Sequence, residues 1–304
     1  PMTLFSIWLV YYPGYYLPKD RAKRIVHLLE SKDKFSRDDF KTMLNDVTSS
    51  ESPDVTAVLV NVLENQSALS DKEKQSLAIL KTWDGITNNE AIAPTIYYKW
   101  IYKVMRKTFA DELGAEGFKQ FMATDIAKIQ ESKQVENEHS VWWDDVTTKD
   151  KTETRSDILM NAFKETISDL DKQLGTDIKK WTWQSVHTLE HVHAITLKAP
   201  FLKGFLNVGP FGAPGAREVI NNLMFGLNDD GLYKVTAGPS TRRVVDFSDI
   251  ENSVSILPTG QSGNPFSKHY KDQAKMYING QYRPMLMNEK TIKNLEDKLV
   301  LESK

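Results

Sequence analysis

The chain has 304 residues, of which 40% are hydrophobic and 26% are charged, as in an ordinary soluble globular protein with a sizeable core. Its 39 basic and 41 acidic residues leave a net charge of −2, which argues against a nucleic acid or an anionic membrane as a partner. There is no cysteine, so disulfides and thiolate chemistry are excluded. The longest apolar run, residues 4–17, is broken at Pro13 and Gly14 and is too short to span a bilayer.

Signals that begin and end helices dominate the first 175 residues. Ser70 and Glu73 form a capping box, and Leu77 and Leu80 follow at helical spacing. Comparable patterns predict helices over residues 19–29, after Ser36, from Ser52, over 93–109 and over 153–174.

Short strands and glycine-rich turns follow Trp181. Strands are expected over residues 187–197, 233–237, 243–247 and 253–257, and a last helix over 288–299. The fold class is therefore α+β: a mainly helical part, 1–180, then a mainly antiparallel β-rich part, 181–304, with a C-terminal helix. We find no internal repeat or linker and treat 1–304 as a single, incomplete unit. Residues 136–151 are expected to form a surface loop held by Trp142 and Trp143.

The stretch of residues 260–285 reads as a tight loop and a helix after the strand at 253–257. Gly260 and Gly263 allow positive φ angles or a close approach of the backbone. Asn264 is a good N-cap, and Pro265 suits the first turn of a helix. The helix should end at Asn279 and Gly280.

This stretch, GQSGNPFSKHYKDQAKMYINGQYRPM, closely resembles the C-terminal segment of the penicillin acylase (penicillin amidase) family. The similarity continues through GPSTRRVVDF, WWDD, LKTWDG and YYPGYYLPKDRAKRI, in the order that the family has them. The resemblance implies an N-terminal nucleophile hydrolase that cleaves amides, and part of its αββα architecture. It corresponds to the later part of the family's large β chain, upstream of which the family has its nucleophilic serine.

The resemblance carries one catalytic residue to this chain, Arg21 in the DRAKRI motif, which in the family orients the nucleophile and an oxyanion-hole asparagine. A permanently charged guanidinium suits that task. Tyr15 and Tyr16 are candidate substrate-binding residues, because the family's acyl pocket draws on this region. The asparagine would precede Pro1. The family's calcium site takes an aspartate from the region of residues 9–12, where no acid stands, so we expect no cofactor.

Other groups of chemically active residues favour a structural interpretation. His187, His191 and His193 share a face if they lie on one strand, and His-x-His is a metal-binding spacing. Glu190 should point the other way, and we therefore expect no metal there.

A proline at the N-terminus, such as Pro1, has an amine that acts as a base or nucleophile in some proteins, but a processing boundary is the favoured interpretation.

Two further constellations contain carboxylates. Ser262, His269 and Asp272 have the residue types of a hydrolase triad but lack the glycine spacing of a nucleophile elbow. On one helix, His269 and Asp272 would contact each other without reaching Ser262. Asp144 and Asp145 are adjacent on a loop, where neighbouring acids usually face different directions.

We therefore expect a C-terminal fragment of a penicillin-acylase-like amidohydrolase, inactive alone, with its parent protein periplasmic or extracellular. Its expected partners are the missing N-terminal portion of the β chain and the α chain. The apolar segment of residues 4–16 also predicts pairing with a second copy. The alternatives are a non-catalytic scaffold or interaction module of the same family and, with less support, a protein with a histidine-based metal site.

Overall fold

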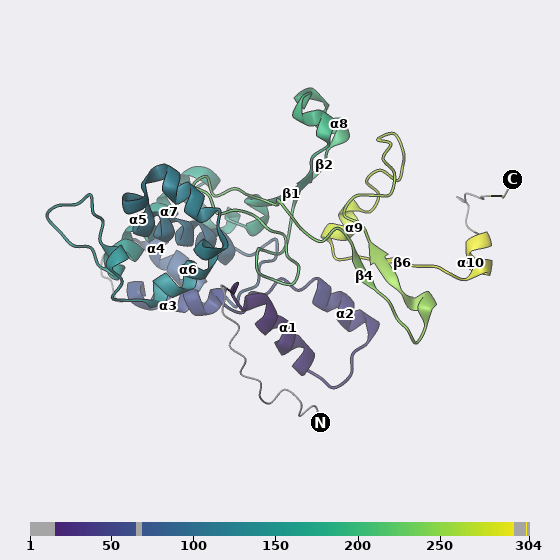
Figure 1. Cartoon of the computed structure of the whole chain (residues 1–304), viewed down its shortest axis with the longest axis horizontal. Helices are drawn as coiled ribbons and strands as arrows, with labels where there is room; N and C mark the ends of the chain where they lie inside the picture. The colour runs from purple at the N-terminus through teal and green to yellow at the C-terminus, as the bar shows by residue number, and fades with distance from the viewer. Residues whose placement is uncertain (1–15, 65–68, 295–301, 303–304) are drawn as a thin grey trace.

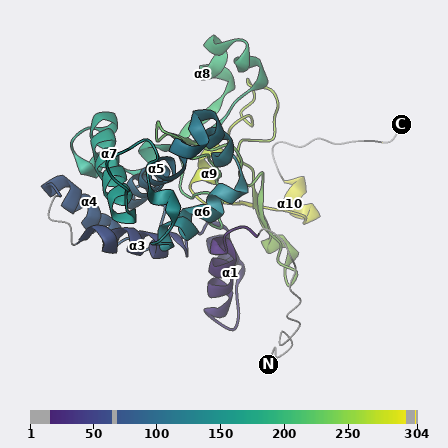
Figure 2. The ribbon, with the colours of Figure 1, turned by 60° about the vertical axis from the view of Figure 1, so that its left-hand side comes forward.

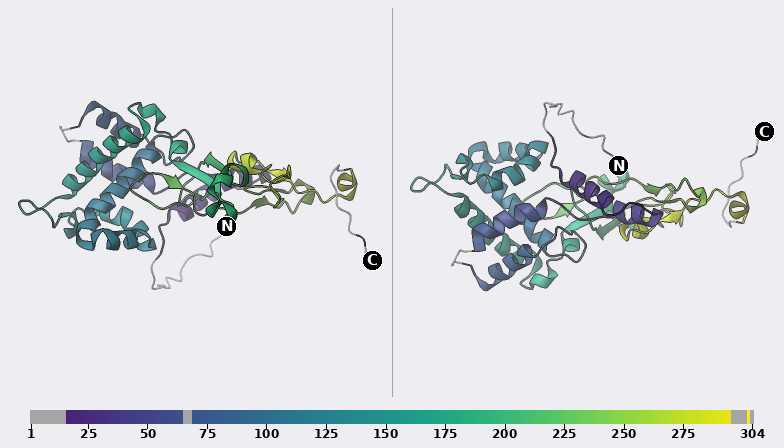
Figure 3. Two further views of the ribbon diagram at one scale, coloured as in Figure 1. Left: turned by 90° about the horizontal axis from the view of Figure 1, so that it is seen from above. Right: turned by 90° about the horizontal axis from the view of Figure 1, so that it is seen from below.

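The computed structural model describes residues 16–64, 69–294 and 302 of the chain (Figure 1). The elongated molecule has helices at one end and two small sheets beyond them, as the views from above and below show (Figure 3). This arrangement confirms the α+β class. The N-terminal segment before Tyr16 lies outside the described residues, and with it Tyr15 and all but the last residue of the segment 4–16 that is predicted to pair.

The helical end is built around one long helix. The helix α5 (Ala93–Met122) contacts α4 (Asp71–Lys81), α6 (Asp125–Glu136) and α7 (Arg155–Leu174), and α3 (Ser52–Glu64) packs on α4, α6 and α7. Trp100 and Ile101 of α5 are fully buried. The helices predicted within the first 175 residues are confirmed, with α5 extending past the expected 93–109.

Capping residues begin three of these helices, and two of them, Ser36 and Ser70, are the ones that the sequence predicts. Ser36 before α2 (Arg37–Leu44), Ser70 before α4 and Thr154 before α7 each form a complete capping box. The helix α1 (Asp20–Glu30) also forms as predicted, but its apolar stripe is not fully covered: Ile25 is 39% exposed and Leu29 is 46% exposed. Figure 2 shows α1 extending away from the other helices.

Two three-stranded sheets follow. In the first, β1 (His187–His191) pairs antiparallel with β2 (Val208–Gly212) and parallel with β3 (Tyr233–Lys234). In the second, β5 (Val254–Ile256) pairs antiparallel with β4 (Arg242–Val244) and with β6 (Arg283–Pro284). The sheets are therefore mainly antiparallel, as expected. The remaining short helices are α8 (Lys203–Leu206), α9 (Ala274–Ile278) and α10 (Glu289–Lys293).

Several predicted boundaries are wrong or only partly described. The strands expected over 233–237 and 243–247 end at Lys234 and Val244. The strand expected over 187–197 ends at His191, and residues Ala194–Leu197 form a 3-10 turn that the side chain of His193 caps. The helix expected from Pro265 begins only at Ala274. The helix expected over 288–299 is present as α10, and residues 295–299 lie outside the described ranges.

The reason for the late start of α9 is local hydrogen bonding. The side chains of Ser262, Asn264 and Ser267 each accept a hydrogen bond from the backbone N–H two residues later. Such turns offer the backbone an alternative to helical hydrogen bonds. His269 and Asp272 therefore lie in a turn rather than on the predicted helix.

The loop at 136–151 is held mainly by one of its two tryptophans. Trp143 is 2% exposed, and its indole N–H donates to the carbonyl oxygen of Asn137 over 2.8 Å. Trp142 is 38% exposed, although its ring centroid lies 5.2 Å from that of Phe109. Burial of Trp143 fixes the short 3-10 turn Val141–Trp143 against the helices.

The main hydrophobic core joins the helices to the first sheet. Trp183, just before β1, stacks on His187 with 4.7 Å between ring centroids and on Tyr98 of α5 with 5.2 Å. Phe225 and Tyr233 complete this aromatic cluster. The ring nitrogens of His187 lie 2.6 Å from the carbonyl oxygen of Ala213 and 3.3 Å from that of Leu223.

His187 should make stability depend on pH. Burial lowers the pKa of His187 from its ordinary 6.5 to about 4 in the folded state, although both backbone hydrogen bonds oppose the shift. Between these pH values the unfolded chain binds the extra proton and the folded chain does not, so stability is lost as the pH falls. The loss between pH 7 and pH 5 should be about 2 kcal/mol from this group.

Urea unfolding at both pH values tests this expectation with His187→Gln, which removes the titrating group. The variant should lose less stability than the wild type on acidification, by about that 2 kcal/mol. His139→Gln, at an exposed histidine, is the matched control and should behave like the wild type. An equal pH dependence in wild type and His187→Gln would contradict the prediction.

Candidate functional site

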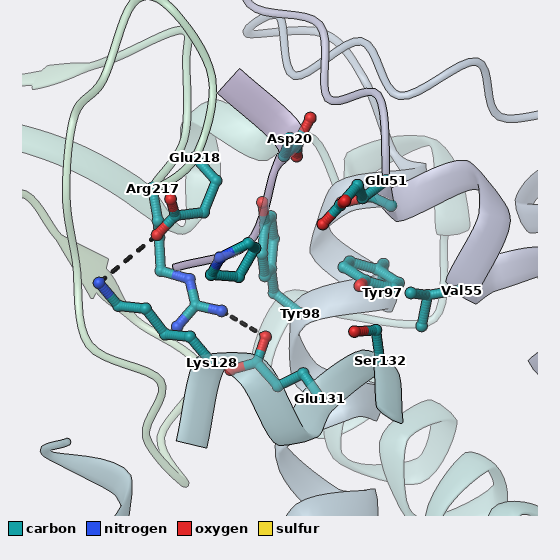
Figure 4. Close-up of a pocket in the computed structure, with 12 residues that line it drawn as sticks. Asp20, Glu51, Val55, Tyr97, Tyr98, Lys128, Glu131, Ser132, Arg217 and Glu218 are labelled. Carbon is teal, nitrogen blue, oxygen red and sulfur yellow. Dashed lines mark hydrogen bonds and ion pairs between the residues drawn. The ribbon is translucent and has the colours of Figure 1, made fainter. Parts of the chain in front are cut away.

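A small cavity of about 50 Å³ lies where α1 begins against the helical end of the molecule (Figure 4). The first turn of α1, the start of α3, α5, α6 and the segment 217–218 all contribute to its wall. Four carboxylates and two cations line it: Asp20, Glu51, Glu131, Glu218, Lys128 and Arg217. A space of this size accommodates water rather than a substrate.

Asp20 fastens the first turn of α1 to the segment before α3. Its carboxylate accepts hydrogen bonds from the backbone N–H of Ser50 and the hydroxyl of Ser49. The hydroxyl of Ser49 in turn accepts from the backbone N–H of Ser52 over 2.9 Å. Burial raises the pKa of Asp20, and the hydrogen bonds from Ser49 and Ser50 oppose that rise. Asp20 also lies at a helix N-terminus, where a negative charge is favoured.

A buried ion pair forms the opposite wall of the cavity. The guanidinium of Arg217 donates to the carboxylate of Glu131 over 2.5 Å, and the side chains are 8% and 10% exposed. The guanidinium also lies 5.9 Å from the ring centroid of Tyr98 and 5.8 Å from that of Phe225. Burial raises the pKa of Glu131, and the charge of Arg217 opposes this. Two polar atoms of the pair, Nε of Arg217 and Oε1 of Glu131, have no partner among the described residues.

Lys128 is the second cation in the wall of the cavity. The ammonium of Lys128 lies 3.4 Å from Glu218 and 3.2 Å from Asp125. Figure 4 shows the Lys128–Glu218 and Arg217–Glu131 interactions side by side. The charges of this cavity therefore hold elements together, and the most direct consequence of the site is a fixed position for the start of α1.

Arg21 follows Asp20 in the first turn of α1, where the resemblance predicts a catalytic arginine. Its side chain is exposed and makes no hydrogen bond or ion pair with the described residues. Tyr16 is 63% exposed near the same end of α1. Tyr15, Pro1 and residues 9–12 lie outside the described ranges. The catalytic role of Arg21 and the substrate contacts of Tyr15 and Tyr16 stay predictions.

The three histidines of the HTLEHVH segment do not converge. His187 is buried in the aromatic cluster, and Nδ1 of His193 accepts a hydrogen bond from the backbone N–H of Ile195. Burial lowers the pKa of His191. Glu190 accepts a hydrogen bond from Asn207 over 2.9 Å. Within the described ranges, no group of three or more histidine and acidic side chains could hold a metal ion.

The triad-like residues come only partly together. His269 and Asp272 pair over 3.0 Å, whereas the hydroxyl of Ser262 accepts from the backbone N–H of Asn264. Ser262 meets His269 through their backbones, because the N–H of Ser262 donates to the carbonyl oxygen of His269 over 3.1 Å. These contacts stabilise the turn, as the glycine-loop interpretation predicts.

Asp144 and Asp145 bind different backbone groups. Asp144 accepts from the N–H of Glu153, and Asp145 accepts from the N–H of Thr147, each over 3.0 Å. They do not act as a catalytic pair in this arrangement.

Sequence reasoning missed the Arg217–Glu131 pair. The two residues stand 86 positions apart, and neither belongs to a recognisable motif. The one available signal is weak: on α6, Glu131 lies on the same side as the buried residues Ala127 and Val135, at a spacing of four residues.

Breaking this pair should be costly. Glu131→Gln leaves the charge of Arg217 buried without a counter-charge and should lower the free energy of unfolding by about 3–5 kcal/mol. Glu64→Gln, in the exposed pair Lys81–Glu64, is the control and should cost about 1 kcal/mol or less. Urea unfolding measures both. A loss for Glu131→Gln no larger than that of the control would contradict a structural role for the pair.

Among the described residues, no helix is long and apolar enough to cross a lipid bilayer.

Comparison with known proteins agrees with the fold and the motifs. The family described as "Penicillin amidase" matches residues 7–294. Acyl-homoserine lactone acylase QuiP of Pseudomonas aeruginosa is 28% identical over 233 residues, covering 71% of this chain and 27% of the relative. The same enzyme of Pseudomonas fluorescens (strain Pf0-1) is 31% identical, covering 69% of this chain and 25% of the relative. Penicillin acylase 2 proenzyme of Pseudomonas sp. (strain SE83) is 24% identical, and the match covers 88% of this chain and 33% of the relative.

The solved structure of a thermostable penicillin G acylase from Alcaligenes faecalis superposes with a TM-score of 0.57 at 16% identity. The superposition covers 97% of this chain and 54% of that one, and it supports the expected fold. The present chain spans about a quarter to a third of the length of the curated relatives it matches. It belongs to the penicillin amidase family.

Proposed function

We propose that this chain supplies the C-terminal part of the β chain of a penicillin-acylase-like amidohydrolase. The observation that carries the proposal is the family match over 7–294, combined with an alignment to only 25–33% of the three curated relatives named above. Of the triad-like residues that the structure describes, Ser262 does not meet His269 as a nucleophile meets its base, since its hydroxyl accepts from the backbone N–H of Asn264. The proposal places the catalytic nucleophile in another part of the protein, as the family resemblance implies.

The proposed reaction follows from the family resemblance. The hydroxyl of an N-terminal serine attacks the amide carbonyl carbon, and the α-amine of the same serine takes the hydroxyl proton. The resulting oxyanion is held by backbone and asparagine donors until the amine leaves with a proton. Water then hydrolyses the acyl-serine ester and releases the carboxylic acid. This chain contributes the scaffold, and Arg21 orients the groups around the oxyanion.

The substrate class proposed for the whole protein is an acyl amide. The curated relatives are named as acyl-homoserine lactone acylases and a penicillin acylase, and both names imply cleavage of an acyl–nitrogen bond. The proposed partners are the upstream part of the β chain and the α chain, and the proposed compartment is the periplasm or the extracellular space.

A comparison of the 304-residue chain with the longer protein tests the proposal. The chain alone should release no amine from an acyl-homoserine lactone or from penicillin above the buffer rate. The longer protein, extended upstream to its serine, should hydrolyse at least one of them, and changing that serine to alanine should abolish the reaction. Catalytic turnover by the 304-residue chain, or no amide hydrolysis by the longer protein, would overturn the proposal; the second result would favour the scaffold alternative.

Arg21 provides a residue-level test in the longer protein. Arg21→Ala should lower kcat by about 100-fold, the scale expected for loss of a group that organises an oxyanion hole. The free energy of unfolding should change little, because the side chain is exposed and unpaired among the described residues. Lys19→Ala, which removes a neighbouring exposed cation, should leave kcat within about twofold. An Arg21→Ala enzyme with wild-type kcat would show that the arginine has no such role.

A further inference from the structure

A second hollow of about 710 Å³ lies between the two halves of α5 and the segment at 226–229. It shares no lining residue with the cavity beside Asp20. Its volume falls in the range of small-molecule sites in proteins. We refer to it as the α5 groove.

The α5 groove exists because α5 is bent. Gly114 has φ 67° and ψ 168°, a backbone conformation that is left-handed in φ and interrupts the helix. The helix after the bend turns back, so the ring of Phe118 lies 6.0 Å from that of Tyr102. The two halves thus face each other across the groove.

The floor of the groove is apolar. Phe118 is 6% exposed, and Ala110, Met122 and Leu227 are half-buried beside it. Ala110 lies two helical turns after Tyr102, and Met122 lies one turn after Phe118, so each pair is on one face of its half-helix. The floor is therefore a continuous surface suited to an alkyl chain.

Cations and a phenol lie around this floor. Arg106 pairs with Asp229 over 2.9 Å, and the same carboxylate pairs with Lys103 over 2.9 Å. The negative charge of Asp229, the one acidic residue of the groove lining, is therefore already balanced by these two cations. Lys119 also lines the groove and is exposed, with no ion pair to the described residues.

Tyr102 adds a hydrogen-bond donor. Its hydroxyl has no hydrogen-bond partner among the described residues, and its side chain lines the groove. Burial and then the charge of Asp229 raise the pKa of Tyr102, so the hydroxyl keeps its proton at neutral pH. A phenol donor and an uncompensated ammonium are the groups that an anionic head group requires.

We infer that the α5 groove binds a single-tailed amphiphile with an anionic head group, its tail on the Phe118 floor and its head beside Lys119. This binding needs no catalytic residue and is independent of amide hydrolysis.

Isothermal titration calorimetry of the 304-residue chain with dodecanoate below its micelle concentration tests the inference. Dodecanoate should bind saturably at one site. Lys119→Glu should weaken binding by about tenfold, because it replaces attraction of the head group with repulsion. Ala115→Trp should weaken it by about tenfold or more, because the indole fills the groove from an exposed helical position.

Matched controls change the same charge and volume elsewhere. Lys74→Glu on α4 and Ala57→Trp on α3 alter exposed positions outside the groove and should leave the affinity within about twofold. Circular dichroism and urea midpoints establish that each variant is folded. Dodecyltrimethylammonium has the same tail and a cationic head, and it should bind at least about tenfold more weakly than dodecanoate.

Three results would overturn the inference. No saturable binding of dodecanoate, equal binding of the cationic amphiphile, or wild-type affinity of folded Ala115→Trp would exclude this site. Since no outcome depends on turnover, the inference and the proposed amidase function fail or stand separately.

Discussion

The stacking of Trp183 between Tyr98 and His187 is the interaction on which the rest of the structure depends. Its indole N–H also donates to the carbonyl oxygen of Gly215 over 2.9 Å, so one side chain joins α5, the start of β1 and the segment after β2. Aromatic rings bury large areas and prefer defined relative orientations, and such a cluster fixes geometry as well as contributing stability. The sheets are small and could not hold this arrangement by their own hydrogen bonds.

The charged cavity depends on that cluster. The guanidinium of Arg217 lies over Tyr98 and Phe225, two of its rings, and from there reaches Glu131 on α6. Asp20, at the other side of the cavity, fastens α1 to the segment before α3. The first turn of α1 is thus held by the hydrogen bonds of Asp20, across the cavity from the Arg217–Glu131 pair that lies on the aromatic cluster. A catalytic role for Arg21 requires such a fixed starting point, since an oxyanion site tolerates little displacement.

Local patterns predicted most helices, and long-range partners explain what was missed. The capping boxes at Ser36 and Ser70 predict their helices well because each cap residue and the N3 residue that it bonds lie within four residues of each other. The helix expected at Pro265 fails because neighbouring serine and asparagine side chains compete for its backbone. Family motifs led to Arg21, but the pairing of Arg217 with Glu131 and the bend at Gly114 depend on tertiary packing and conformation, which periodicity does not report.

The partners of charged groups distinguish the two hollows. Around Asp20, the carboxylates and cations are bound mainly to one another or to backbone groups, and a group engaged in this way is poorly placed to recognise a ligand without losing a contact that holds the fold. In the α5 groove, Asp229 is already neutralised by Lys103 and Arg106, while Lys119 and the hydroxyl of Tyr102 remain available among the described residues. An apolar floor next to such available donors gains contacts when a ligand arrives, and it breaks no contact within the protein. This difference favours a structural role for the cavity beside Asp20 and a binding role for the α5 groove.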